Sequence, residues 1–286
     1  RTLSLRSSWV QIPPPAPFRF IFMTKTGLIG MAFLFVDIET FIDPDDETSG
    51  LNPYRKNSKV ISISYKFYAG KKLPYKNKKT GELDLNPLTI KKVWESDEKT
   101  ILEEFWEFFK GKVEDEVRTY HGEEVTDLKV VGFNHTKFDL PYLFGRMMEH
   151  RIATPTELYS ILLARPHQVD LMQLAMSMNP TNFKTKAGKW ARPTQMNHEL
   201  FNQGQKITNQ TLGIKIKKGS GKDITKYYLE KNWESIEEYI HEEFTFEELY
   251  EKIRKCIFPE AGPKPKLLLE YEKKEVKNAE DKKSSE

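Results

Sequence analysis

The first clear structural signal in the chain is a short apolar run that ends in two acidic residues. The run, AFLFVDIET at residues 32–40, is continuously apolar up to Val36 and then places Asp37 and Glu39 two positions apart. Such a run is typical of a strand that other layers cover on both faces, as in an α/β sheet, and it limits the possible folds more than any other segment. Because side chains alternate along a strand, Asp37 and Glu39 are expected to share one face at the strand's end, where α/β proteins form their sites.

The rest of the chain alternates between strand and helix patterns, as an α/β domain requires. Strands are predicted at residues 59–68, 90–96 and 128–134, a strand end leading into a helix at 169–178, and helices at 97–110, 138–150, 223–231 and 233–257. In the first of these strands four residues are predicted to share one face: Ile61, Ile63, Tyr65 and Phe67. These patterns predict a single α/β domain.

The amino-acid composition excludes several kinds of site. The 286 residues include one cysteine, Cys256, which rules out an internal disulfide and a cysteine-based zinc or iron–sulfur site, so a bound metal would need oxygen or histidine ligands. The net charge is only +3, so contact with nucleic acid would depend on local basic segments. The apolar stretch at residues 18–36 carries Arg19 and Lys25 and is too short to span a bilayer, so we expect a cytoplasmic protein.

The two ends of the chain differ in composition from its middle. Residues 1–30 lack periodicity and contain three successive prolines, and their WVQIP segment back-translates to a sequence that resembles the T-arm of a tRNA gene. We expect a spurious extension of the reading frame beside a mobile element, with translation starting at Met23 or Met31; an ordinary disordered extension is the alternative. One folded domain is expected at residues 31–258, followed by a charged, largely disordered tail at residues 259–286.

Neighbouring carboxylates at the end of a buried strand repel each other and are costly to bury. A cation or a proton that neutralises Asp37 and Glu39 removes this cost, and a divalent metal is the natural explanation. Asp139 follows the strand at residues 128–134 and begins the next helix, so its carboxylate is expected to converge on the same edge of the sheet. An acid at a helix start is also a common N-cap, and that alternative stays open.

A further carboxylate lies within the apolar face of the helix predicted at residues 233–257. At about 100° per residue the apolar stripe consists of Ile236, Tyr239, Ile240, Phe246, Tyr250, Ile253 and Ile257. Glu243 falls in the centre of this stripe, with Glu247 nearby, so Glu243 is predicted to face the strand-end acids. Tyr239, one turn earlier, would lie beside the same site. A solvated helix face is the alternative.

Three segments together resemble the motifs of a known family. They are FVDIET at residues 35–40, GFNHTKFDLPYL at residues 132–143, with an Asn-x3-Phe-Asp pattern, and EEYIHEEF at residues 237–244. Their order and spacing resemble those of the DEDD, or DnaQ-like, 3′-to-5′ exonuclease superfamily, and within it the proofreading exonuclease domain of family B DNA polymerases. The resemblance covers roughly residues 31–257 and implies an RNase H-like α/β fold, a mixed sheet flanked by helices with the site at the strand ends.

The resemblance also implies phosphodiester hydrolysis with two divalent metal ions, Mg2+ or Mn2+. By this resemblance Asp37 would bridge both ions and Asp139 would support the second one. Glu39 and Glu243 would complete the site of the attacking water, which Tyr239 would orient by a hydrogen bond. The family has Asp at the last acidic position, and the extra methylene of Glu243 moves the carboxylate by about 1.5 Å, more than the ~0.5 Å that active sites tolerate. A helix shift or a larger ion such as manganese would absorb this difference.

Contacts to substrate are expected from two sources. The resemblance places Thr40, Asn134 and Phe138 against the terminal nucleotides, although Phe138 could equally belong to the core. Two basic segments that also carry aromatic rings, at residues 65–79 and 184–192, have the composition of single-strand binders. Their members include Lys66, Lys71, Lys72, Lys76, Lys78, Lys79, Tyr65, Tyr68, Tyr75 and Trp190. Solvated surface loops are the alternative.

The expected function is therefore a stand-alone, metal-dependent 3′-to-5′ exonuclease for single-stranded DNA 3′ ends, in DNA replication, DNA repair or a mobile element. The expectation of a stand-alone enzyme rests on the short chain after residue 258. One alternative is a nucleic-acid-binding module in which Glu243 has weakened cleavage. The other is an exoribonuclease acting on RNA 3′ ends, because phosphate and metal contacts do not read the sugar. No membrane partner is expected.

Overall fold

The structure is a computed structural model that describes the central part of the chain. The described residues are 32–43, 57–69, 86–120, 123–176, 205–206, 208–210, 212–215, 219 and 221–257. The predicted N-terminal extension at residues 1–30 and the predicted tail at residues 259–286 lie outside this part. The basic segments at residues 71–79 and 184–192 lie outside it as well.

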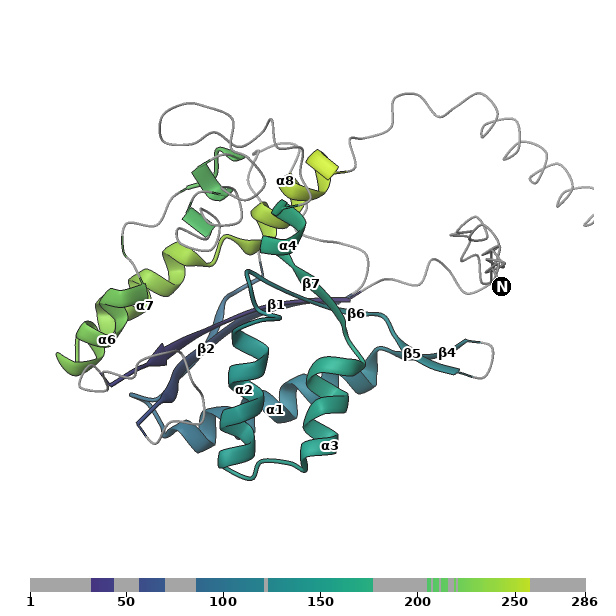
Figure 1. Cartoon of the computed structure of the whole chain (residues 1–286), viewed down its shortest axis with the longest axis horizontal. Helices are drawn as coiled ribbons and strands as arrows, with labels where there is room; N and C mark the ends of the chain where they lie inside the picture. Colours follow the sequence, from purple (N-terminus) through teal and green to yellow (C-terminus); the bar gives the residue numbers. More distant parts are fainter. Residues whose placement is uncertain are drawn as a thin grey trace, which may run out of the picture.

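A five-stranded mixed sheet forms the middle of the molecule (Figure 1). Its strands are β1 (Ala32–Phe41), β2 (Lys59–Tyr68), β3 (Thr89–Lys92), β6 (Leu128–Gly132) and β7 (His167–Asp170), in the order β3-β2-β1-β6-β7. The β2 strand runs antiparallel to both of its neighbours, β1 and β3, whereas β1, β6 and β7 run parallel to one another. A separate hairpin pairs β4 (Val117–Tyr120) with β5 (Glu123–Thr126). The predicted α/β fold, a mixed sheet flanked by helices, is confirmed.

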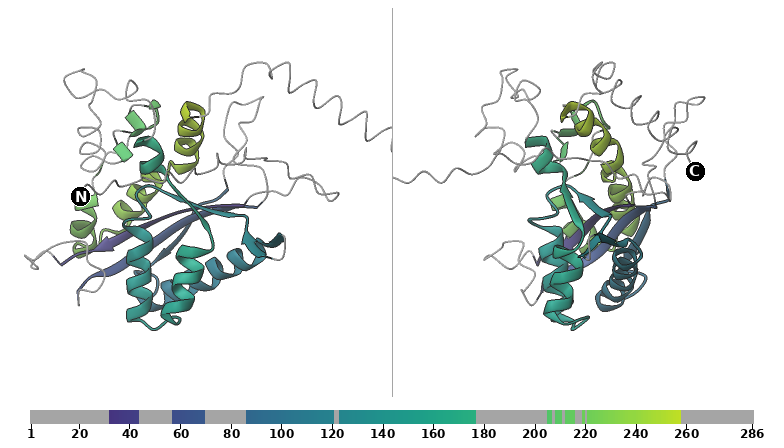
Figure 2. Two further views of the ribbon diagram at one scale, coloured as in Figure 1. Left: turned by 45° about the vertical axis from the view of Figure 1, so that its right-hand side comes forward. Right: turned by 90° about the vertical axis from the view of Figure 1, so that its right-hand side faces the viewer.

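Helices cover both faces of this sheet (Figures 1 and 2). One face carries α1 (Glu98–Asp115), α2 (Asp139–Glu149), α3 (Pro155–Leu158) and the π-helical turn Tyr159–Ala164. The other face carries α4 (Leu171–Met176), α6 (Gly221–Leu229), α7 (Trp233–Glu243) and α8 (Phe246–Ile257). Among the described helices none is long and apolar enough to cross a membrane.

The central strand β1 is buried on both faces, as its continuous apolar run predicts. Leu34 and Val36 pack into the core under α1 and α2, whereas Phe33 and Phe35 pack against α4 and α8. Burying large side chains on both faces stabilises this strand by about 1.5–3 kcal/mol for each fully buried side chain. The strand that carries the first two acids is thus held between both layers of helices.

A β-bulge in β2 corrects the predicted alternation of that strand. Glu39 pairs with Ser62 and Thr40 pairs with Val60, so Ile61 is the extra residue. One extra residue reverses the alternation. Ile61 therefore packs under α6 and α7, whereas Ile63 packs into the core on the opposite face. The prediction that Ile61 shares a face with Ile63 is wrong.

The helix predicted at residues 233–257 is also wrong, because it is interrupted. The α7 helix ends at Glu243, and α8 begins at Phe246. Phe244 leaves the helical conformation with φ −74° and ψ 68°, and the amide of Thr245 donates to the carbonyl of Glu243 at 2.7 Å. Phe244 and Phe246 are both buried with their ring centroids 5.0 Å apart. Residues two positions apart do not share a face of a continuous helix, so this packing requires the break.

Candidate active site

The candidate site lies where β1 and β6 separate. Their parallel pairing ends at Phe35 and Val131, and β6 ends at Gly132. A Cβ at Gly132 would lie 2.8 Å from the Cβ of His135 and 2.9 Å from the carbonyl oxygen of Val36, so only glycine allows this close approach. Ligand sites of α/β sheets form at such points of separation.

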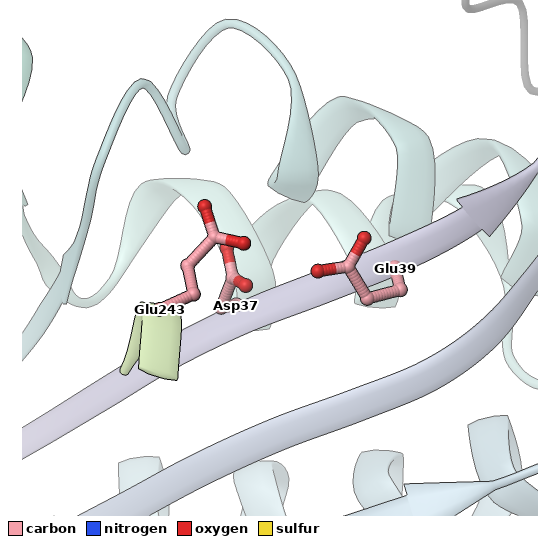
Figure 3. A group of neighbouring side chains, drawn as sticks. All are labelled: Asp37, Glu39 and Glu243. Carbon is pink, nitrogen blue, oxygen red and sulfur yellow. The ribbon is translucent and has the colours of Figure 1, made fainter. Parts of the chain in front are cut away.

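Three carboxylates converge at this point. Asp37 and Glu39 project from one face of β1, and Glu243 reaches them from the end of α7 (Figure 3). One carboxylate oxygen from each residue lies within 4.8 Å of the others. Glu39 is buried, and the other two are half-buried. The structure thus brings together three of the four predicted metal ligands, although Glu243 lies far from Asp37 and Glu39 in the sequence.

Asp139, the fourth predicted ligand, is buried next to this cluster. It is the first residue of α2, and its Oδ1 accepts a hydrogen bond from the amide of Ile38 at 3.2 Å. Phe138, and not Asp139, occupies the N-cap position, so the capping alternative does not describe this carboxylate. Burial raises the pKa of Asp139 to about 7, and the negative charges of Glu243 and Asp170 act in the same direction.

Tyr239 lies one turn before Glu243 on α7 and is buried beside the same acids. Its phenol hydrogen-bonds the Glu243 carboxylate. Burial raises the pKa of Tyr239 far above its usual range, and the charges of Glu243 and Glu39 add to the shift. The phenol therefore stays protonated and acts as a hydrogen-bond donor, not as a base.

The residues present fit a hard divalent cation. Carboxylate oxygens are the ligands that Mg2+ and Mn2+ prefer. The three carboxylate oxygens lie within 4.8 Å of one another, which is close enough for them to hold one such cation together. Ser62 lies on β2 opposite Glu39, and its buried hydroxyl has no hydrogen-bond partner among the described residues. The small Ser62 and Ser64 leave room on this face, beside Glu39 and Asp37 respectively.

The residues predicted to contact substrate occupy different environments. Thr40 is half-buried at the end of β1. Asn134 has a positive φ of 61°, and its backbone N–H donates to Asp170 Oδ1 at 3.0 Å. The side-chain oxygen of Asn134 has no hydrogen-bond partner in the described part of the chain. Phe138 packs against the main core, with its ring 5.5 Å from that of Tyr142.

The prediction that Tyr65, Lys66 and Tyr68 bind single-stranded nucleic acid is wrong, because all three side chains are buried. The Lys66 ammonium lies 2.8 Å from Glu247 Oε1, and both side chains are buried. The Tyr68 hydroxyl donates to the same Glu247 oxygen at 3.0 Å, and Tyr65 belongs to the main core. Sequence reasoning missed the tertiary partner that holds Lys66 inside. Lys71, Lys72, Lys76, Lys78, Lys79, Tyr75 and Trp190 lie outside the described residues.

Sequence reasoning also missed two features beside the site. A Cβ at Gly219 would lie 2.9 Å from the ring of Tyr239, so this glycine allows the chain to cross that ring. The Lys59 ammonium lies 5.3 Å from the ring centroid of Phe41 and 4.7 Å from that of Tyr228. Phe41 follows Glu39 by two positions on β1. Neither feature has a local sequence signal, because each depends on a contact between distant segments.

Comparison with known proteins finds structural likeness at low sequence identity. No protein-family model matches the chain, and no curated protein matches it significantly in sequence. E. coli exonuclease I in complex with a 5cy-dT13 oligonucleotide matches with a TM-score of 0.44 and 10% identity, over 80% of this chain and 41% of that chain. A product-bound exonuclease I matches with a TM-score of 0.43 and 9% identity, over 80% and 44%. E. coli exonuclease I with a dA16 oligonucleotide matches with a TM-score of 0.35 and 12% identity, over 58% and 35%. The chain spans less than half the length of these solved chains.

Proposed function

We propose that this protein is a metal-dependent 3′-to-5′ exonuclease of the DEDD type that hydrolyses the terminal phosphodiester of single-stranded DNA. The observation that carries the proposal is the convergence of Asp37, Glu39 and Glu243 within 4.8 Å, at the point where β1 and β6 separate. Three carboxylates at this distance repel one another unless cations or protons neutralise them. Two of the three motifs that resemble the superfamily supply these side chains, and the remaining motif supplies Asp139 beside them.

The side chains of the cluster have distinct parts in this proposal. Asp37, Glu39 and Glu243 would hold one cation, and Asp139 would support a second together with Asp37. When bound, the cations would lower the pKa of an attacking water and stabilise the charge that develops on the phosphate oxygens. Tyr239 would orient the water, because its protonated phenol already points at Glu243.

Binding of the DNA end would use residues around the cluster. The Asn134 amide oxygen and the Thr40 side chain would contact the terminal nucleotides. Lys59 would contact a backbone phosphate, because its ammonium lies over Phe41 and Tyr228 close to Glu39 along β1. A cation over aromatic rings is a combination that binds single strands without reading their sequence.

The presence of Glu243 does not by itself favour the alternative of a nucleic-acid-binding module with weakened cleavage. Glu243 is the last residue of α7, and its carboxylate lies within 4.8 Å of those of Asp37 and Glu39. The longer side chain thus reaches the other two acids, so we retain catalysis as the proposal.

The test is cleavage of a 5′-labelled single-stranded DNA by the full chain with Mg2+, with Mn2+ and with chelator. We expect a ladder that shortens from the 3′ end only when a cation is present. A matched RNA oligonucleotide separates deoxyribonuclease from exoribonuclease activity. Binding of the oligonucleotide without cleavage under either cation would overturn the proposal in favour of a binding module.

A further inference from the structure

Two buried amide side chains grip the break between α7 and α8. Gln205 Nε2 donates to the Glu243 carbonyl oxygen at 2.6 Å and to Thr245 Oγ1 at 3.0 Å. Asn209 Nδ2 donates to the same Thr245 oxygen at 3.0 Å. Gln205 and Asn209 are only 7% and 3% exposed. We call Gln205, Asn209 and Thr245 the polar clasp.

The polar clasp solves a bonding problem that the helix end creates. The last carbonyls of a helix have no partner within the helix. At Glu243 the carbonyl receives the Thr245 amide at 2.7 Å, the Thr245 hydroxyl at 3.4 Å and the Gln205 amide. Asn209 is anchored in turn, because its Nδ2 also donates to the Lys215 carbonyl at 3.2 Å. The clasp therefore ties the end of α7 to Gln205, Asn209 and the Lys215 backbone.

The residue that the clasp grips is the one whose carboxylate enters the acidic cluster. A negative side chain at a helix C-terminus is unfavourable, because the helix dipole places partial negative charge there. Glutamate also has one more rotatable bond than aspartate, so its carboxylate needs a fixed backbone to reach a fixed point. Hydrogen-bond donors on the Glu243 carbonyl offset the partial negative charge of the helix end. They also fix the backbone from which the Glu243 side chain extends.

We propose that the polar clasp is a positioning device that fixes the end of α7 and sets where the Glu243 carboxylate lies relative to Asp37 and Glu39. The inference rests on the proposed function, in which Glu243 is a metal ligand. Gln205, Asn209 and Thr245 do not touch the cation themselves. They act through Glu243, so their loss should change how strongly the cluster binds a divalent cation.

The discriminating experiment is calorimetric titration of the full chain with Mn2+, using two substitutions at one position. Thr245→Val keeps the shape and removes the hydroxyl, whereas Thr245→Ser keeps the hydroxyl. We expect Thr245→Val to weaken Mn2+ binding by about 10- to 100-fold, as loss of a residue that orients a metal ligand does, and Thr245→Ser to bind within about twofold of wild type. Gln205→Leu should reproduce the valine result. Gln210→Leu, at an exposed neighbour, is the control.

The readouts separate a positioning role from a purely structural one. Thermal unfolding of each variant reports stability, and the Mn2+ concentration for half-maximal cleavage reports the cation site. A lower unfolding temperature with unchanged Mn2+ affinity in both Thr245→Val and Gln205→Leu would overturn the inference. Wild type that binds Mn2+ but does not cleave DNA would overturn the proposed function and leave the clasp standing. Wild type that does not bind Mn2+ would overturn both.

Discussion

Asp139 has the most buried carboxylate of the candidate site, and its protonation links folding to pH. Because its pKa is raised to about 7, the folded protein holds this proton more tightly than the unfolded chain does. Its contribution to stability is complete below the unfolded pKa and is lost as the pH rises through about 7.

We therefore expect the free energy of unfolding of the metal-free protein to fall by about 2–3 kcal/mol between pH 5 and pH 7 on account of this group, at about 1.4 kcal/mol per pH unit. Urea unfolding in chelator at several pH values measures it. Asp139→Asn should lack this component of the slope, and saturating Mn2+ should reduce it in wild type. Equal slopes in wild type and Asp139→Asn would contradict the assignment.

Tyr239 offers a test of water positioning. Tyr239→Phe removes the hydroxyl that bonds Glu243 while keeping the buried ring. We expect kcat to fall by about 100-fold with little change in KM, because the lost donor orients the reacting group and does not bind the DNA. Steady-state kinetics on a single-stranded oligonucleotide measures both parameters. A change confined to KM would show that Tyr239 binds substrate instead.

Lys59 offers a test of nucleic-acid binding at the end of β1. Lys59→Ala should weaken binding of single-stranded DNA and reduce the slope of log affinity against log salt by about one. Fluorescence anisotropy in chelator measures binding without cleavage. Lys99→Ala, at an exposed lysine of α1 on the other side of the sheet, is the matched control. An unchanged slope in Lys59→Ala would remove this residue from the interface.

At the scale of helices and strands, a buried ion pair joins α1, α2 and β2. Arg146 Nε donates to Glu98 Oε1 at 2.8 Å, and the Val60 amide donates to the same oxygen at 2.7 Å. His150 Nε2 lies 2.8 Å from Glu98 Oε2. Removing Arg146 leaves the buried Glu98 carboxylate without its guanidinium partner.

Arg146→Ala should therefore lower the free energy of unfolding by about 3–5 kcal/mol. Lys91→Ala breaks a more exposed ion pair, with Glu104 at 2.6 Å, and should cost less than about 1 kcal/mol. Chemical denaturation of both variants gives the comparison. Similar losses in the two variants would show that burial does not govern these pairs.

The hydrophobic periodicity of the sequence was sufficient to predict most helices and strands. It failed where contacts between distant segments determine the local structure. The periodicity of residues 97–110 and 138–150 gives α1 and α2, because their buried faces follow the helical repeat. The break at Phe244 leaves the apolar stripe in phase, so periodicity alone cannot reveal it. The β4–β5 hairpin was not predicted, and the bulge at Ile61 shows only in the pairing of β1 with β2.

At the scale of the whole molecule, the acidic residues of the candidate site could be predicted from the sequence. The residues that hold them in place could not. Strand alternation places Asp37 and Glu39 on one face, and the stripe of the last helices places Glu243 opposite them. Gln205 and Gly219 have no comparable signal, because each acts on a residue that is distant in the sequence. A charged residue within an apolar stretch interrupts the hydrophobic pattern, so the sequence reveals it. A polar or small residue that supports such an acid looks like any other surface residue in the sequence, so it is missed.

The most direct test of the central claim is the cleavage rate of Asp37→Ala against wild type, measured on single-stranded DNA with Mg2+ and paired with thermal unfolding. We predict a loss of at least about a thousandfold in rate, because the proposed cation site loses the residue shared by both ions. The metal-free variant should unfold at the same or a higher temperature, because one of three neighbouring carboxylates is gone. A folded Asp37→Ala variant that cleaves at the wild-type rate would contradict the account.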